Sequence, residues 1–171
     1  MRGPALIAVS LLAACGAAPE NKAAPAAAAP APAPGQWELT AEVTRFAKSD
    51  QGTPRINTPV GTRTTENVCV GAGDRLASEL FSGGGYRCTY PTYYVRNGRL
   101  NLTLNCRRDG LTGDIPMNVT GTFEANGIEY TRNLRTSLIS DGDVEIDARV
   151  TGRRTGDCTP QAPAAGGDKA G

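Results

Sequence analysis

Between residues 35 and 158, short runs in which apolar and polar residues alternate are separated by turns that contain glycine. In the run from Trp37 to Val43, every second residue is apolar, and the residues between them are Glu or Thr. A two-residue period is typical of antiparallel strands with one face in the core and the other in water. The pattern therefore predicts an all-β domain, an antiparallel meander of about seven strands that forms a curved sheet or small barrel. It does not distinguish a closed barrel from an open sheet or a sandwich.

Three dipeptides that favour tight hairpins occur along this region: Asn97-Gly98, Asn126-Gly127 and Asp141-Gly142. The loop length at each can be predicted by asking which register sets apolar residues opposite one another, because a slip of one residue reverses every side chain. A two-residue loop at the second dipeptide pairs Phe123 with Tyr130. At the third, a three-residue loop over 140–142 pairs Leu138 with Val144.

The same argument applied to the first dipeptide predicts a three-residue loop over 96–98, which pairs Tyr94 with Leu100 and Cys88 with Cys106. A two-residue loop would put the two cysteines on opposite faces unless a bulge intervened near Pro91. We therefore expect Cys88 and Cys106 to form a disulfide bond.

The Cys88–Cys106 bond leaves Cys69 to pair with Cys158 across the domain. Zinc binding and a redox-active pair are the rival interpretations of these four cysteines. The chain has no histidine and no Cys-x-x-Cys motif, so we expect no metal.

Residues 70–85 lack strand character. Asp74 is suited to cap a short helix near 73–81, and the run of three glycines that begins at Gly83 would end it. A phosphate-binding loop would need a G-x-G-x-x-G or Gly-Lys-Ser/Thr motif, and neither occurs. We expect the helix to cover one end of the sheet.

An apolar run from Ala5 to Ala14 follows Arg2 and is about half the length that spans a bilayer. Leu12-Ala13-Ala14-Cys15 resembles the bacterial lipobox, in which the cysteine is acylated and becomes the mature N-terminus. The resemblance implies a lipoprotein signal peptide over 1–14, lipid attachment at Cys15 and, because Gly16 follows, sorting to the outer membrane. An ordinary secretory signal that happens to contain a cysteine is the alternative.

Residues 15–34 are rich in Ala and Pro and have no periodic apolar face, which predicts a disordered linker that begins at the lipidated cysteine. Residues 159–171 are predicted to be a disordered tail. The folded domain is therefore expected over 35–158, and its two disulfides suit an oxidising compartment outside the cytoplasm.

Several short motifs occur along this domain in a definite order. They are P34-G-Q-W-E-L-T40, E66-N-V-C-V70, Cys88 and Cys106, G121-T-F123, and the segment from Asp147 to Cys158. The domain resembles the family called domain of unknown function 3617 over nearly the whole of residues 34–158. Arg153-Arg154-Thr155 makes the final segment longer than the family's usual ending. The resemblance implies an envelope location and a cysteine framework, but it implies no activity.

Composition restricts the function further. The formal charge is +1, from 18 Lys and Arg against 17 Asp and Glu, which gives no global field for nucleic acid. The absence of histidine removes the commonest general base at neutral pH. The acids at 143, 145 and 147 fall on the solvent face of a strand. We therefore expect no catalytic residues, no cofactor and no enzyme.

Two non-enzymatic functions remain. The first is a structural or interaction module that is tethered to the membrane by its lipid and faces the periplasm, with another envelope protein or the cell wall as partner. The second is a binding protein for a small apolar or anionic ligand inside a barrel-like cavity. Five residues are candidates to line such a cavity: Tyr90, Tyr94, Phe123, Tyr130 and Arg132. The aromatic residues would equally fill an ordinary core, and Arg132 would equally form an internal ion pair or lie at a wet strand end.

Overall fold

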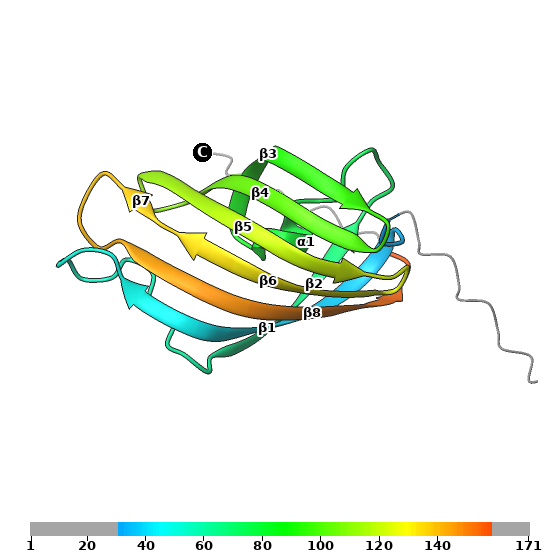
Figure 1. Cartoon of the computed structure of the whole chain (residues 1–171), viewed down its shortest axis with the longest axis horizontal. Coiled ribbons are helices and arrows are strands. Elements are labelled where there is room, and N and C mark those ends of the chain that lie inside the picture. Colours follow the sequence, from blue (N-terminus) through cyan, green and yellow to red (C-terminus); the bar gives the residue numbers. More distant parts are fainter. Residues whose placement is uncertain (1–30, 159–171) are drawn as a thin grey trace, which may run out of the picture.

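The computed structural model describes residues 31–158, which form one curled antiparallel sheet in the order β2-β1-β8-β6-β5-β4-β3, with β7 paired to β5 alone (Figure 1). The elements are β1 (Gly35–Lys48), β2 (Arg63–Val70), α1 (Glu79–Ser82), β3 (Tyr86–Arg96), β4 (Arg99–Arg108), β5 (Gly113–Phe123), β6 (Gly127–Arg135), β7 (Ser137–Leu138) and β8 (Val144–Gly156). The all-β prediction is confirmed, and the sheet is a half-barrel.

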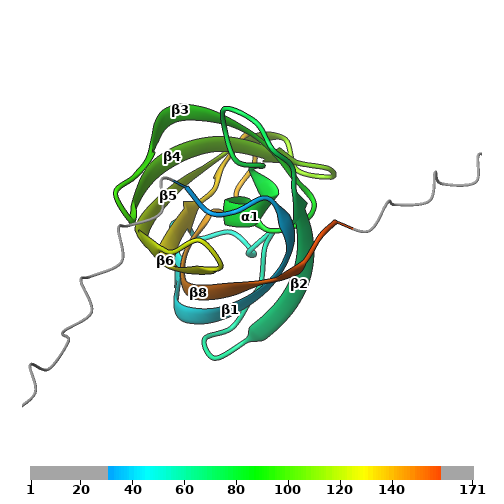
Figure 2. The ribbon, with the colours of Figure 1, turned by 90° about the vertical axis from the view of Figure 1, so that its right-hand side faces the viewer.

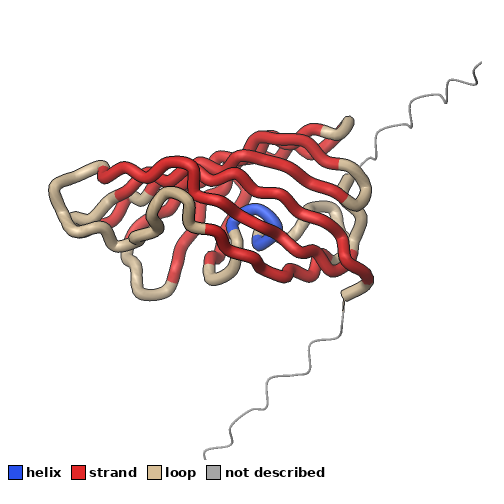
Figure 3. Tube along the Cα trace, turned by 90° about the horizontal axis from the view of Figure 1, so that it is seen from below, coloured by secondary structure: helices blue, strands red, loops and turns tan. Residues whose placement is uncertain are grey.

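The two edge strands, β2 and β3, do not pair with each other, and α1 contacts both of them. Seen end-on, α1 lies within the curve of the sheet, between β2 and β3 (Figure 2). The view from below likewise shows the helix enclosed by strands (Figure 3). The short helix therefore fills the seam that a closed barrel would close with hydrogen bonds. Within residues 31–158, no helix has the length and apolar character needed to cross a bilayer.

The concave face of the sheet and the inner face of α1 form the core. Trp37, Leu39 and Val43 of β1 point inward and are buried, as the alternation predicts. The convex face carries ion pairs between neighbouring strands, such as Arg153 with Glu38 at 2.8 Å. Such exposed pairs contribute little to stability, so burial of apolar area holds the fold together.

Both predicted disulfides are present. Cys88 of β3 is directly opposite Cys106 of β4, with 4.0 Å between their Cα atoms. Cys69 on the edge strand β2 is bonded to Cys158, which follows β8. The second bond therefore links the edge strand β2 to the C-terminal end of the domain.

The predicted three-residue loop over 96–98 is wrong, although the disulfide it led to is correct. Arg96 pairs with Arg99, and both Asn97 and Gly98 have positive φ angles of 53° and 72°, as a two-residue type I′ turn requires. The register then shifts between Thr89 and Thr92. This bulge, which includes Pro91, returns the cysteines to one face.

The register predicted around Asn126-Gly127 is wrong by two residues. The N–H of Glu124 donates to Gly127 O at 2.8 Å, so the turn lies one residue earlier, and Gly121 rather than Phe123 is opposite Tyr130. A Cβ atom on Gly121 would collide with the backbone of Tyr130, so glycine permits this close pairing. A shift of two residues keeps every side chain on its predicted face.

The predicted loop over 140–142 is also wrong, because β6 ends at Arg135. Thr136 exchanges hydrogen bonds with Val144, through its N–H at 3.0 Å and its Oγ1 at 2.8 Å. The next two residues form β7 and turn away to pair with Gly113 and Asp114 of β5. Leu138 is therefore not opposite Val144.

The predicted helix near 73–81 is shorter and later than expected. Helix α1 begins at Glu79, with Ser78 rather than Asp74 at its N-cap position, and Gly83 ends it with a φ of 78°. The backbone of Leu76 is bound by side chains of β3 instead: its N–H donates to Tyr93 Oη at 3.0 Å, and its carbonyl accepts from Tyr90 Oη at 3.1 Å. The predicted signal peptide, the lipid site at Cys15, most of the linker and the tail lie outside the described residues.

Candidate functional site

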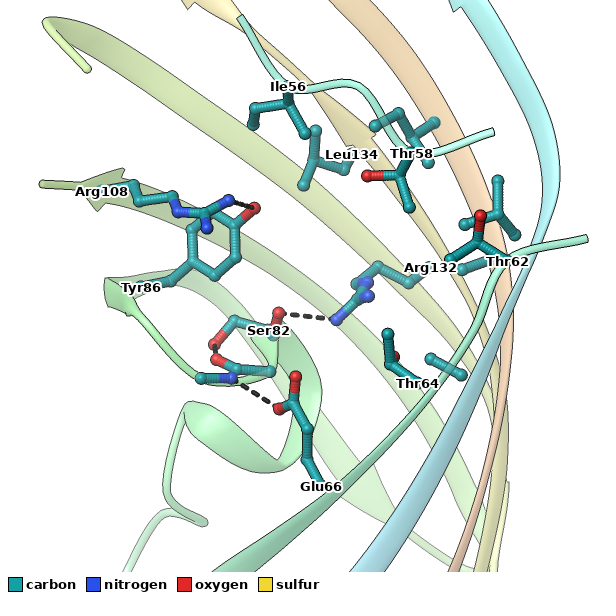
Figure 4. Close-up of a pocket in the computed structure, with 16 residues that line it drawn as sticks. Ile56, Thr58, Thr62, Thr64, Glu66, Ser82, Tyr86, Arg108, Arg132 and Leu134 are labelled. Carbon is teal, nitrogen blue, oxygen red and sulfur yellow. Dashed lines mark hydrogen bonds between the residues drawn. The ribbon is translucent and has the colours of Figure 1, made fainter. Parts of the chain in front are cut away.

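A pocket of about 180 Å³ lies inside the half-barrel, beside α1 and towards the end at which β2 and β8 begin (Figure 4). Its lining is Ala41, Val43, Ile56, Thr58, Thr62, Thr64, Glu66, Ser82, Gly83, Gly84, Tyr86, Arg108, Arg132, Leu134, Ile146 and Ala148. Several of these residues, including Thr64, Gly84 and Arg108, are solvent-exposed, so the pocket opens to water. The volume is close to that of the roughly 150 Å³ cavity that accommodates benzene in another protein.

Arg132 of β6 is the partly buried cation of this pocket. Its Nη1 donates to the carbonyl oxygens of Ser82 at 2.6 Å and Phe81 at 3.1 Å, at the C-terminal end of α1. No carboxylate of the described region forms an ion pair with Arg132. The guanidinium is therefore held in place by carbonyl groups, while its charge is not neutralised by direct contact with an acid.

Glu66 of β2 lies on the other side of Gly83. Its Oε2 accepts a hydrogen bond from the N–H of Gly84 at 2.7 Å. A Cβ atom added to Gly83 would lie 3.2 Å from Glu66 Oε2 and 3.4 Å from Arg132 Nη1. Glycine at 83 thus provides both the positive φ that ends α1 and the space between the two charged groups.

Arg108, at the end of β4, is the second cation of the lining. Its guanidinium lies over the ring of Tyr86, 5.3 Å from the ring centre, and its Nη1 donates to Tyr86 Oη at 3.4 Å. The side chain is exposed, and no acid of the described chain pairs with it. Counting Arg132, Arg108 and Glu66, the pocket has an excess of one positive charge.

The loop between β1 and β2 forms one wall, because Ile56, Thr58 and Thr62 lie on it. Asp50 fixes the base of this loop. One of its oxygens accepts from Gly142 N and Asp143 N at 2.8 Å each, and the other accepts from Gly52 N at 2.7 Å. The hydrogen bonds from Asp143 and Gly142 are the main reason why the pKa of Asp50 is lowered.

Among the residues predicted from the sequence to line a cavity, Arg132 lies in this pocket. Tyr130 lines a smaller adjoining cavity of about 20 Å³. Its buried hydroxyl donates to Leu80 O at 2.7 Å and so fixes α1 to β6, and burial raises the pKa of Tyr130.

The other three candidates lie elsewhere. Tyr90 packs edge-on against Phe81 of α1 and does not line the pocket. Burial raises the pKa of its hydroxyl group. Phe123 is buried at the other end of the sheet. The prediction for Tyr94 is wrong: the two-residue turn sets it opposite Asn101 on the outer face, where it stacks with Arg96, and Tyr93 packs inside instead.

Sequence reasoning missed Glu66 and Arg108 as pocket residues, although a signal was present. In β2, Glu66 lies on the same face as the buried Val68 and Val70, because alternate residues of a strand point the same way. In β4, Arg108 follows Leu100, Leu102, Leu104 and Cys106 on the inward face. A charged residue that continues an apolar alternation is placed at the edge of the core. Arg132, between Tyr130 and Leu134, shows the same pattern.

The geometry defines a small all-β protein, a disulfide-linked half-barrel with a charged pocket on its concave side. A family model described as Protein of unknown function (DUF3617) matches residues 32–158. The chain belongs to this family, as the order of the short motifs predicts. No curated protein and no solved structure matches the chain. In the part of the chain that the structure describes, no three or more acids and cysteines gather into a group that could hold a metal ion.

Proposed function

We propose that this chain is a non-enzymatic protein of the bacterial cell envelope that binds a small ligand in the pocket around Arg132. One observation carries the proposal. The interior of the half-barrel is otherwise packed with apolar side chains, yet it keeps an open space whose base is a partly buried guanidinium without an acidic partner among the described residues. Binding sites commonly combine apolar walls with a few convergent polar groups.

The non-enzymatic part of the proposal follows from where the carboxylates lie. Glu145 and Asp147 are on the convex face, where Arg45 pairs with both, and Glu145 also pairs with Arg135. Glu66 is the carboxylate of the pocket lining, and Gly84 N donates to one of its oxygens. Among the described lining residues there is therefore no second acid beside Glu66, and the hydrogen bond that the Glu66 carboxylate accepts comes from a backbone N–H rather than from a hydroxyl nucleophile.

The envelope part of the proposal rests on the lipobox-like Leu12-Ala13-Ala14-Cys15 and on the two disulfides, which suit an oxidising compartment. A lipid at Cys15, in the outer membrane, would tether the domain through the Ala/Pro-rich residues before Gly35. Because β1 begins at Gly35, at the end of the sheet away from the pocket, the pocket would face away from the tether. Labelling cells with radioactive palmitate tests this: we expect label in the wild type and none in Cys15→Ala, and an unlabelled wild type would refute the anchor.

A tethered structural or interaction module is the second candidate function. The observation that favours it is the pocket volume, which is below the roughly 300–1,000 Å³ of common ligand sites. In that case the partner would be another envelope protein or the cell wall, and Arg132 would serve only to hold α1.

One experiment separates the two functions. The full chain is expressed in a bacterium, purified in mild detergent and denatured, and the released small molecules are identified by mass spectrometry. Arg132→Met is processed in parallel, with Arg149→Met of the convex face as the matched control. We expect one compound to be released from the wild type and from Arg149→Met and to be depleted from Arg132→Met. Identical profiles from all three proteins would favour the structural role.

A further inference from the structure

We propose that the pocket selects a small organic monoanion, a monocarboxylate with a short alkyl or aryl body. This inference rests on the proposed binding function and specifies the ligand class. The charge of the pocket favours a monoanion. Two guanidinium groups and one carboxylate line the pocket, so a single negative charge on the ligand balances it.

Arg132 retains hydrogen-bonding capacity for a ligand. Its two hydrogen bonds to the protein both leave from Nη1, to the carbonyl oxygens of Phe81 and Ser82. The described structure contains no buried side-chain nitrogen or oxygen without a partner, so Nε and Nη2 are reached by solvent. These two parallel donors are the edge of a guanidinium that receives a carboxylate in bidentate geometry.

The remaining wall of the pocket is largely apolar. Beside the charged groups, on the concave face of the sheet, it includes the aliphatic side chains of Ala41, Val43, Leu134 and Ile146. A body of about six carbon atoms fits a volume near 180 Å³. Inorganic phosphate would leave these apolar surfaces in contact with water, and a neutral amide would leave the guanidinium without a counter-charge.

The position of Arg108 adds a second contact. It lies at the open side of the pocket and is exposed, with its guanidinium over Tyr86. An exposed cation at the mouth attracts an anion at longer range but contributes less affinity than a partly buried one. We therefore expect Arg132 to control affinity and Arg108 to contribute a smaller, salt-sensitive part.

The test is calorimetric titration of the full chain with hexanoate, benzoate, hexanamide and phosphate. We expect both carboxylates to bind, and hexanamide and phosphate to bind at least tenfold more weakly. Arg132→Gln should weaken hexanoate by roughly 10- to 100-fold. Arg108→Gln should weaken it only a few-fold, with the difference from wild type disappearing at high salt.

The matched control is Arg99→Gln, because Arg99 begins β4 at the end away from the pocket. It should leave hexanoate binding unchanged. Arg132→Lys keeps the charge without the bidentate fork, so it should fold like the wild type and bind with intermediate affinity. Circular dichroism of each variant checks that the sheet is formed.

Two results would overturn the inference: equal binding of hexanamide and hexanoate, or preference for phosphate. Failure of all four probes would also overturn it, and the released-ligand experiment then decides the proposed function independently. If a neutral compound is released from the wild type but depleted from Arg132→Met, the proposed binding function stands, and only the proposal that the ligand is a monoanion is refuted.

Discussion

The substitution Tyr130→Phe should destabilise the domain, because it removes the hydroxyl group that binds α1 to β6. Tyr130 is almost fully buried on β6, and its Oη donates to the carbonyl oxygen of Leu80 at 2.7 Å. In a longer helix the N–H of Gly84 would bind that carbonyl, but here it donates to Glu66. Phenylalanine would leave Leu80 O buried without this donor, while Phe81 O keeps its hydrogen bond from Arg132.

Leaving a buried carbonyl unsatisfied costs about 1–3 kcal/mol. The ring itself stays, so the packing of Tyr130 against Phe81, with ring centres 5.8 Å apart, adds little to this loss. At about 2.1 cal/mol/K of unfolding entropy per residue, a domain of this size loses about 4 °C in Tm for each kcal/mol. Tyr130→Phe should therefore lower Tm by roughly 4–11 °C.

Urea and thermal unfolding, followed by circular dichroism with both disulfides intact, measure this change. Tyr94→Phe is the matched control, because it removes the same hydroxyl from the outer face and should alter stability by less than about 0.5 kcal/mol. Equal stability of Tyr130→Phe and the wild type would refute the claim that this hydroxyl holds the helix in the seam. So would an equal loss in the two variants.

Three further changes test the framework of the domain. Gly121→Ala should lower the free energy of unfolding by about 2–3 kcal/mol in urea titrations, because its Cβ would collide with the backbone of Tyr130; an unchanged midpoint would contradict the observed register. Replacing both cysteines of the Cys69–Cys158 disulfide with alanine should lower the free energy of unfolding by about 4.6 kcal/mol, and the same change at Cys88–Cys106 by about 3 kcal/mol, because the bonds close loops of 89 and 18 residues. A double variant as stable as the wild type would show that the disulfide it lacks does not stabilise the domain. Asp50→Asn should cost more stability near pH 7 than in acid, because the folded pKa of Asp50 lies below its ordinary value of 3.8. The contribution of its carboxylate is therefore fully present above pH 3.8 and is lost as the pH falls through the folded pKa; a pH-independent difference in urea midpoints would refute this.

The sequence predicts which face each strand buries better than it predicts which residues are paired. Period-two alternation assigned the faces of β1, β5 and β6 correctly, because burial acts on each side chain separately. All three predicted hairpin registers are wrong, because such a dipeptide indicates that a turn is near but does not determine which residues of the two flanking strands pair. The register around Gly121 depends on close backbone contact, and that at Cys88 depends on the bulge beside Pro91, both tertiary features.

The pocket was only partly predictable. Arg132 was a candidate because it continues an apolar alternation, and Glu66 and Arg108 carry the same signal on β2 and β4. The loop that forms one wall has no period, so nothing in its sequence indicates that Ile56 and Thr58 reach the pocket. Asp50, which fixes that loop, is recognisable only once the turn at Gly142 is placed beside it.

The most direct test of ligand binding inside the half-barrel is an amide chemical-shift map of the isotope-labelled protein during titration with hexanoate. We expect saturable shifts centred on Gly83, Gly84, Ala41 and Ala148, with little change at Glu129 and Arg149 on the convex face. No saturable shift, or largest shifts on the convex face, would contradict this expectation.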